Sequence, residues 1–227
     1  MRFATRVAGT VTALMAFALA PSAAASAQTV SLTDGSSDTW QVSWDPNHAG
    51  SETYTQVGSV PNGDVTKMTV SHTRKLIQVT VTYVDLVHDD DYQPEIREWF
   101  RLDDGSGAML NLFVEDSWRK PEVFFVKRSV DGPWAARQRA RCAGVTSKID
   151  VEHDTWTTKL PTSCLGAPRW VQFHGDVGSG GARNDDGTQT YFADNPHSAG
   201  VEDRITGASE ACFTECEGWT GKIRRTR

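Results

Sequence analysis

KLIQVTVTYVD, residues 75–85, alternates apolar and polar side chains over nearly its whole length. Ile77, Val79, Val81 and Tyr83 fall on one side of an extended chain, and the polar residues between them fall on the other. β-Branched and aromatic residues with a period of two are typical of a strand that has one buried and one solvated face. The stretch therefore predicts a strand of an antiparallel sheet that covers a core.

Eight further stretches have the composition of strands, and turn residues such as those at 61–63, 103–107 and 178–181 separate them. No segment sustains a helical period. Short strands divided by turns predict an all-β fold, an antiparallel β-sandwich or jelly roll of about nine strands. The additional strands are expected at 40–44, 64–70, 96–102, 108–115, 122–127, 145–152, 155–160 and 169–176.

The two ends of the chain differ in composition from this middle part. Residues 1–27 have the pattern of a secretory signal peptide: Arg2 and Arg6, the apolar stretch 7–20, and the small residues of Ala25-Ser26-Ala27 before Gln28. Polar residues and glycine dominate after position 179. We therefore expect a signal peptide at 1–27, a β-sandwich domain at 28–200 and a loosely ordered C-terminal extension at 201–227, with secretion to the extracellular space.

Charge limits the partners. The 200 residues after the expected cleavage site hold 21 basic and 29 acidic side chains, a formal net charge of −8. Nucleic acid is therefore not expected as a partner, because phosphate binding needs a concentrated basic face. No stretch after residue 27 is long and apolar enough to span a membrane. The basic cluster in the last six residues is expected to be a frayed, solvated tail.

Four cysteines in an exported chain predict two disulfides rather than a metal site. Cys142 and Cys164 bracket two expected strands and the turn between them, so a hairpin would bring them together. Cys212 and Cys216 lie in one short segment and are expected to pair with each other. Four cysteines allow three pairings, and the other two stay open. Zinc is disfavoured because neither C-x-x-C nor H-x-x-x-H occurs.

Three stretches together resemble a family of secreted β-sandwich proteins of high-GC Gram-positive bacteria. They are the long strand with its lead-in at 64–86, the acidic turn Leu102-Asp103-Asp104-Gly105, and the block 142–166 that ends in Leu160-Pro161-Thr162-Ser163-Cys164-Leu165-Gly166. The resemblance covers roughly residues 60–176. It implies a sandwich similar to that of family 9 carbohydrate-binding modules, and it implies no catalytic residues.

Signatures of common enzymes are absent, including G-x-S-x-G, H-E-x-x-H, the phosphate loop and the dinucleotide fingerprint. No cofactor is therefore expected. His174 and Asp176 lie two residues apart on an expected strand, so they share a face and could form a base with its orienting acid. The competing interpretation is stronger: with Trp170 and Gln172 they form a polar face turned to solvent.

Acidic turns could ligate calcium through oxygen, as at Asp103-Asp104 and at Asp185-Asp186. His88 to Asp91 is a third acidic stretch. None has the alternating spacing of an EF-hand loop, and Asp with Gly is ordinary turn chemistry, which is the favoured interpretation.

Eight tryptophans are many for this length. Aromatic rings on a sandwich face can stack on sugars. Trp156 and Trp170, which lie beside polar positions, are the expected ligand contacts, whereas Trp40, Trp44 and Trp99 are expected to be internal. The leading hypothesis is a secreted, non-enzymatic protein that binds a ligand, such as an extracellular glycan. The alternatives are a secreted hydrolase of an extracellular polymer and a domain that binds or inhibits a protein partner.

Overall fold

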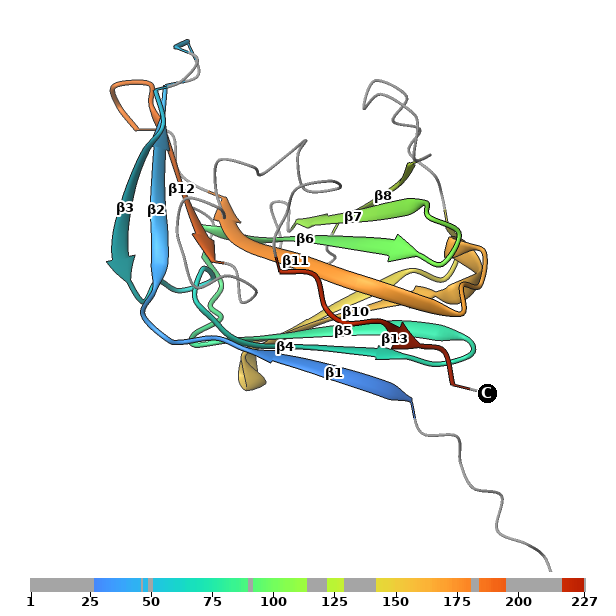
Figure 1. Ribbon diagram of the computed structural model, residues 1–227. Helices are drawn as coiled ribbons and strands as arrows, with labels where there is room; N and C mark the ends of the chain where they lie inside the picture. Colours follow the sequence, from blue (N-terminus) through green and yellow to red (C-terminus); the bar gives the residue numbers. More distant parts are fainter. Residues whose placement is uncertain are drawn as a thin grey trace, which may run out of the picture.

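The computed structural model describes residues 27–45, 47–48, 51–89, 92–113, 122–128, 142–180, 184–194 and 218–226. The expected signal peptide, except Ala27, and the pair Cys212 and Cys216 lie outside these residues. Two antiparallel sheets pack against each other, which confirms the predicted all-β sandwich (Figure 1). No helix among the described residues is long and apolar enough to cross a membrane.

The smaller sheet has five strands in the order β1-β4-β5-β10-β9. Its centre is β5, the strand that the alternating stretch predicted, and β5 buries its odd-numbered side chains. Hairpins join β4 to β5 and β9 to β10. The bounds are β1 Gln28–Thr33, β4 Val65–His72, β5 Leu76–Tyr83, β9 Thr146–Asp150 and β10 Thr155–Pro161.

The larger sheet has the order β3-β2-β12-β11-β6-β7-β8, with β13 paired to β11. Figure 1 shows β3, β2 and β12 standing steeply at one end, while β11, β6 and β7 run across the smaller sheet. The bounds are β2 Thr39–Trp44, β3 Thr53–Gly58, β6 Gln93–Leu102, β7 Gly107–Phe113, β8 Glu122–Arg128, β11 Trp170–Gly180, β12 Gln189–Asp194 and β13 Ile223–Arg224.

All nine expected strands exist, with ends that differ by a few residues, but the described residues contain four more. β1 and β3 are edge strands, and β3 is largely exposed, so neither shows clear alternation of apolar side chains. β12 follows a polar turn, and β13 has only two residues. Edge strands gain their order from a partner strand rather than from their own composition, and for this reason the sequence did not predict them.

One apolar core fills the space between the sheets. Alternate residues of β4, β5 and β10 meet alternate residues of β6 and β11, and Phe100 packs against Phe173 with ring centroids 5.5 Å apart. A glycine is required at position 175, because a Cβ there would lie 2.7 Å from Phe173 Cζ and 3.0 Å from Met68 Sδ.

The end of the chain returns to the core, which corrects the expectation of a frayed tail for residues 218–226. Ile223 has no exposed surface and belongs to the core cluster. Thr220 Oγ1 accepts a hydrogen bond from the Phe173 N–H at 2.9 Å, and the Thr220 N–H donates to the Phe173 carbonyl, also at 2.9 Å. The His72 ring lies 3.1 Å from the Ile223 carbonyl. This segment is therefore an integral part of the sandwich.

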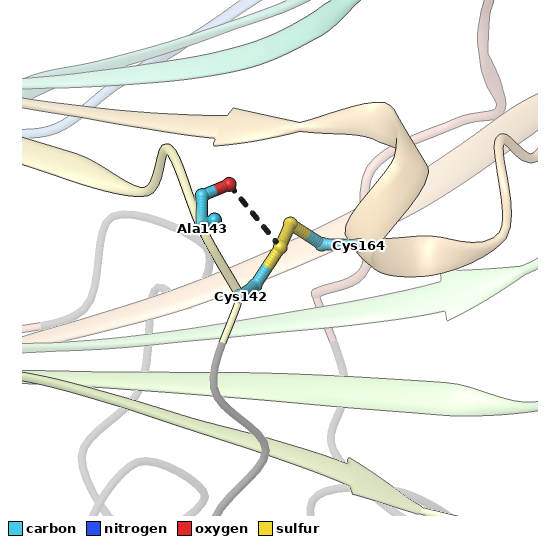
Figure 2. Close-up of a disulfide and its surroundings, with 3 residues drawn as sticks. All are labelled: Cys142, Ala143 and Cys164. Carbon is cyan, nitrogen blue, oxygen red and sulfur yellow. Dashed lines mark hydrogen bonds between the residues drawn. A yellow bond between two sulfur atoms is a disulfide. The ribbon is translucent and has the colours of Figure 1, made fainter.

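The disulfide between Cys142 and Cys164 is confirmed, with a Cα–Cα distance of 5.8 Å. Figure 2 shows Cys142 on the segment that leads into β9 and Cys164 in the short 3₁₀ turn η3 (Thr162–Leu165) after β10. A second 3₁₀ turn, η2 (Val151–His153), joins the two strands. The bond thus closes the base of the β9–β10 hairpin, as the spacing predicted.

Candidate functional site

The candidate site lies on the face of the larger sheet that points away from the core, called here the outer face. Strand pairing defines it, because residues directly opposite each other in a sheet share a face. Phe173 and Val177 of β11 face the core, so His174 and Asp176 face outward. Val42 and Trp99 are fully buried but do not belong to the core cluster, because they too lie on this face.

Four aromatic side chains, called the aromatic strip, extend across β3, β2 and β12. Val42 pairs with Tyr54 on one side and with Tyr191 on the other, while Trp40 and Trp44 precede and follow Val42 on the same face. All four rings are partly exposed, and Val42 is fully buried between them. Partly exposed rings around a buried aliphatic floor offer the flat apolar surface on which sugar rings stack.

A charged cluster of Glu95, Arg97, His174 and Asp176 continues the outer face on β6 and β11. Arg97 is directly opposite Asp176. Its Nε donates to Glu95 Oε1 at 3.0 Å, and His174 Nε2 lies 3.0 Å from Asp176 Oδ1. These charges meet near the border of the aromatic strip, where guanidinium and carboxylate groups could bind hydroxyl groups.

Electrostatics links the cluster to the strip. Burial opposes the charge of Arg97, but the adjacent Glu95, with Asp176 and Tyr191, outweighs it and raises the pKa of Arg97. Burial is also the main cause that raises the pKa of Tyr191, and Tyr54 adds to it. Both groups therefore keep their protons at neutral pH, so Arg97 stays a cation and Tyr191 a hydroxyl donor.

The predicted pair of His174 and Asp176 is close, yet His174 is only 1% exposed. The expectation that it faces solvent is wrong. Its ring lies between Trp99 and Trp219, at centroid distances of 5.4 and 5.7 Å, and Arg101 stacks over Trp219 at 4.1 Å. Trp219 comes from the C-terminal segment, which the sequence did not place on this face. Because Trp219 covers His174, Asp176 is the accessible residue of the pair, with 18% of its side chain exposed.

The two expected ligand contacts lie in different places. Trp156 has no exposed surface and packs in the core, with its ring N–H bonded to Ser147, so the expectation of an exposed ring is wrong. Its sequence neighbours are polar because alternate residues of β10 lie on the solvent side of the sheet. Trp156 itself lies on the opposite, buried side. Trp170 is partly exposed on the outer face, and Lys222 Nζ lies 4.4 Å from its ring centroid. Trp170 stays a predicted contact.

The aspartates expected as weak calcium candidates make turn contacts. Asp103 accepts hydrogen bonds from the backbone and side chain of Arg169, which lower the pKa of its carboxyl. Asp104 accepts from the Ser106 N–H at 2.9 Å, and Asp186 accepts from the Thr188 N–H at 2.9 Å. Asp185 is exposed in the same turn as Asp186. These contacts fit the turn interpretation favoured above.

The sequence did not reveal the aromatic strip. Trp40 and Trp44 were expected to be internal, and the strands that carry Tyr54 and Tyr191 were not predicted. Pairing of strands distant in sequence assembles the strip, so only the alternation within 40–44 could have signalled it. Comparisons with protein-family models, with curated proteins and with solved structures found no match.

Proposed function

We propose that this protein is a secreted, non-enzymatic protein that binds an extracellular carbohydrate chain on the outer face of its larger sheet. One observation carries the proposal: the aromatic strip and the charged cluster lie on the same outer face of neighbouring strands of the larger sheet. Rings supply stacking area, and fixed polar groups beside them supply hydrogen bonds, the two components of sugar recognition.

Export is part of this proposal and rests on the pattern of residues 1–27. The disulfide that closes the β9–β10 hairpin supports it, because such bonds persist in oxidising compartments. The family resemblance drawn from the sequence stays a prediction as well.

The binding test uses a panel of soluble polysaccharides and a glycan array with the full chain. We expect Tyr54→Ala and Tyr191→Ala each to weaken binding about 5- to 20-fold, because each removes a stacking ring. Tyr191→Phe, which keeps the ring, should retain most of the affinity. Gln78→Ala, on the solvent-facing side of the smaller sheet, serves as the control and should bind like the unmodified protein.

Two results would reject the proposal: no binding to any glycan, or binding that the two ring deletions leave unchanged. Trp170→Ala measures how far the site extends along β11, since Trp170 lies on the same face six residues before Asp176. A protein captured in a pull-down together with a flat glycan response would favour the protein-partner alternative.

The hydrogen-bonded pair of His174 and Asp176 favours a second candidate, a hydrolase of an extracellular polymer. In this role Asp176, the accessible member, would act as the base and the buried His174 would orient it. Turnover of glycan, ester or peptide substrates that is lost in both His174→Ala and Asp176→Asn would establish the enzyme. Turnover unaffected by both changes would exclude this pair as its source.

A further inference from the structure

Two aspartates of one loop and a third from near the other end of the described chain converge at one corner of the sandwich. Asp34 follows β1, Asp38 directly precedes β2, and Asp194 is the last residue of β12. One carboxylate oxygen from each lies within 4.8 Å of the other two. Oxygens at such separations can share one Ca²⁺ ion, whose oxygen ligands lie at about 2.3–2.6 Å.

A buried carboxylate outside this trio, that of Asp64, is held against the loop that carries Asp34 and Asp38 and provides independent evidence. Asp64 has no exposed surface, and its Oδ2 accepts a hydrogen bond from the N–H of Ser37, between the two loop aspartates, at 2.9 Å. Its other oxygen, Oδ1, is shielded from water and has no hydrogen-bond donor among the described residues. A buried carboxylate oxygen without a donor is costly unless a cation or a proton compensates it.

The backbone holds these groups together. The Val65 N–H donates to Asp194 Oδ2 at 2.7 Å, and the Asp34 N–H donates to the Thr66 carbonyl at 3.0 Å. Asp38 also has a carboxylate oxygen, Oδ1, that is buried and lacks a donor among the described residues. Three carboxylates therefore lie close together from fixed positions, and the buried Asp64 contacts the loop between two of them.

We infer that the three aspartates Asp34, Asp38 and Asp194 form a calcium site, with the buried carboxylate of Asp64 beside it. The donor set is all carboxylate, which suits a hard cation and not zinc, which prefers nitrogen and sulfur. The inference is independent of the proposed glycan binding, although Trp40 of the aromatic strip lies two residues after Asp38.

The position of the site indicates that a bound ion would connect the two sheets. Asp34 and Asp64 adjoin strands of the smaller sheet, whereas Asp38 and Asp194 adjoin strands of the larger sheet. An ion bound here fastens the two sheets at the end where β2 and β12 stand away from the other strands (Figure 1). Weak affinity suffices in an extracellular setting, where dissociation constants of about 0.1–1 mM are usual.

The test compares thermal unfolding of the full, disulfide-bonded chain in excess chelator and in CaCl₂, together with calorimetric titration of CaCl₂. At about 100 times the dissociation constant, calcium should raise Tm by roughly 5–10 °C. Asp38→Asn and Asp34→Asn should each lose most of this shift and weaken binding at least about 10-fold. Glu152→Gln removes one exposed acidic charge from the turn η2 and should keep the full shift.

The competing explanation is that no cation binds at this corner. In that case calcium would produce no heat of binding and no shift of Tm, and this result would overturn the site. An equal Tm shift in Asp38→Asn, Asp34→Asn and the unmodified chain would also overturn it. Each shift is measured relative to the same variant in chelator, so a variant that is merely less stable still gives an answer.

Discussion

The two faces of β6 and β11 differ in chemistry, although neighbouring residues of the same two strands form them. On the inner face Phe100 meets Phe173 in a closed apolar core. On the outer face Arg97 meets Asp176, and the groups are polar, partly exposed and charged. The inner face therefore supplies the core on which folding depends, while the partly exposed polar groups of the outer face can contribute to a binding site.

The largest expected effect tests the inner face. Phe173→Ala removes a fully buried ring from the centre of the core and should lower the free energy of unfolding by about 3–5 kcal/mol. Its neighbour Gln172 faces outward and donates a hydrogen bond to the Thr220 carbonyl, so Gln172→Ala should cost only about 1 kcal/mol. Urea unfolding of the two variants measures the contrast. Equal losses would contradict the division into two faces.

A second effect comes from Glu98, a carboxyl group on the inner face. Burial raises its pKa to about 8 from the ordinary 4.5, and the Thr158 hydroxyl acts in the opposite direction. Between pH 4.5 and pH 8 the Glu98 carboxyl therefore stays protonated in the folded protein, whereas in the unfolded chain it has lost its proton. Stability contributed by this proton is complete below pH 4.5 and is lost as the pH rises towards 8.

Glu98→Gln removes this dependence while keeping the shape of the side chain. We expect the variant to match the unmodified protein near pH 5 and to exceed it by roughly 3 kcal/mol at pH 8. Urea unfolding at pH 5, 6, 7 and 8 measures the difference, and Glu152→Gln, an exposed glutamate, gives the background. A difference that does not change with pH would mean that Glu98 is ionised in the fold.

The sequence predicted the inner face far better than the outer one. Alternation within a single strand was enough to place Ile77, Val79 and Val81 in the core, and spacing was enough to pair Cys142 with Cys164. These features are local. Alternation also placed His174 and Asp176 together, but it could not show that Trp219, 45 residues after His174, covers the histidine.

The remaining features depend on which strands become neighbours. Tyr54 and Tyr191 share a face only because β3, β2 and β12 pair in this order, and Asp194 meets Asp34 and Asp38 only because the two sheets join at one corner. A weakly patterned edge strand gives no sign of its partner. Sites assembled by pairing are for this reason less visible in a single sequence than hairpins and cores.

The smallest expected effect on stability tests the outer face. The side chains of Arg97 and Glu95 are 37% and 28% exposed, and an ion pair so accessible to water contributes at most about 1 kcal/mol. Arg97→Gln should therefore leave unfolding almost unchanged.

Glycan binding, however, should fall about 10-fold in Arg97→Gln, because a bound hydroxyl group loses a charge-assisted hydrogen bond. Arg97→Lys keeps the charge without the planar fork and should show an intermediate loss. Titration calorimetry with the glycan found in the panel measures affinity, and urea unfolding measures stability. A loss of stability above about 2 kcal/mol with unchanged binding would make Arg97 a structural residue, and the outer face would then resemble the inner one in its role.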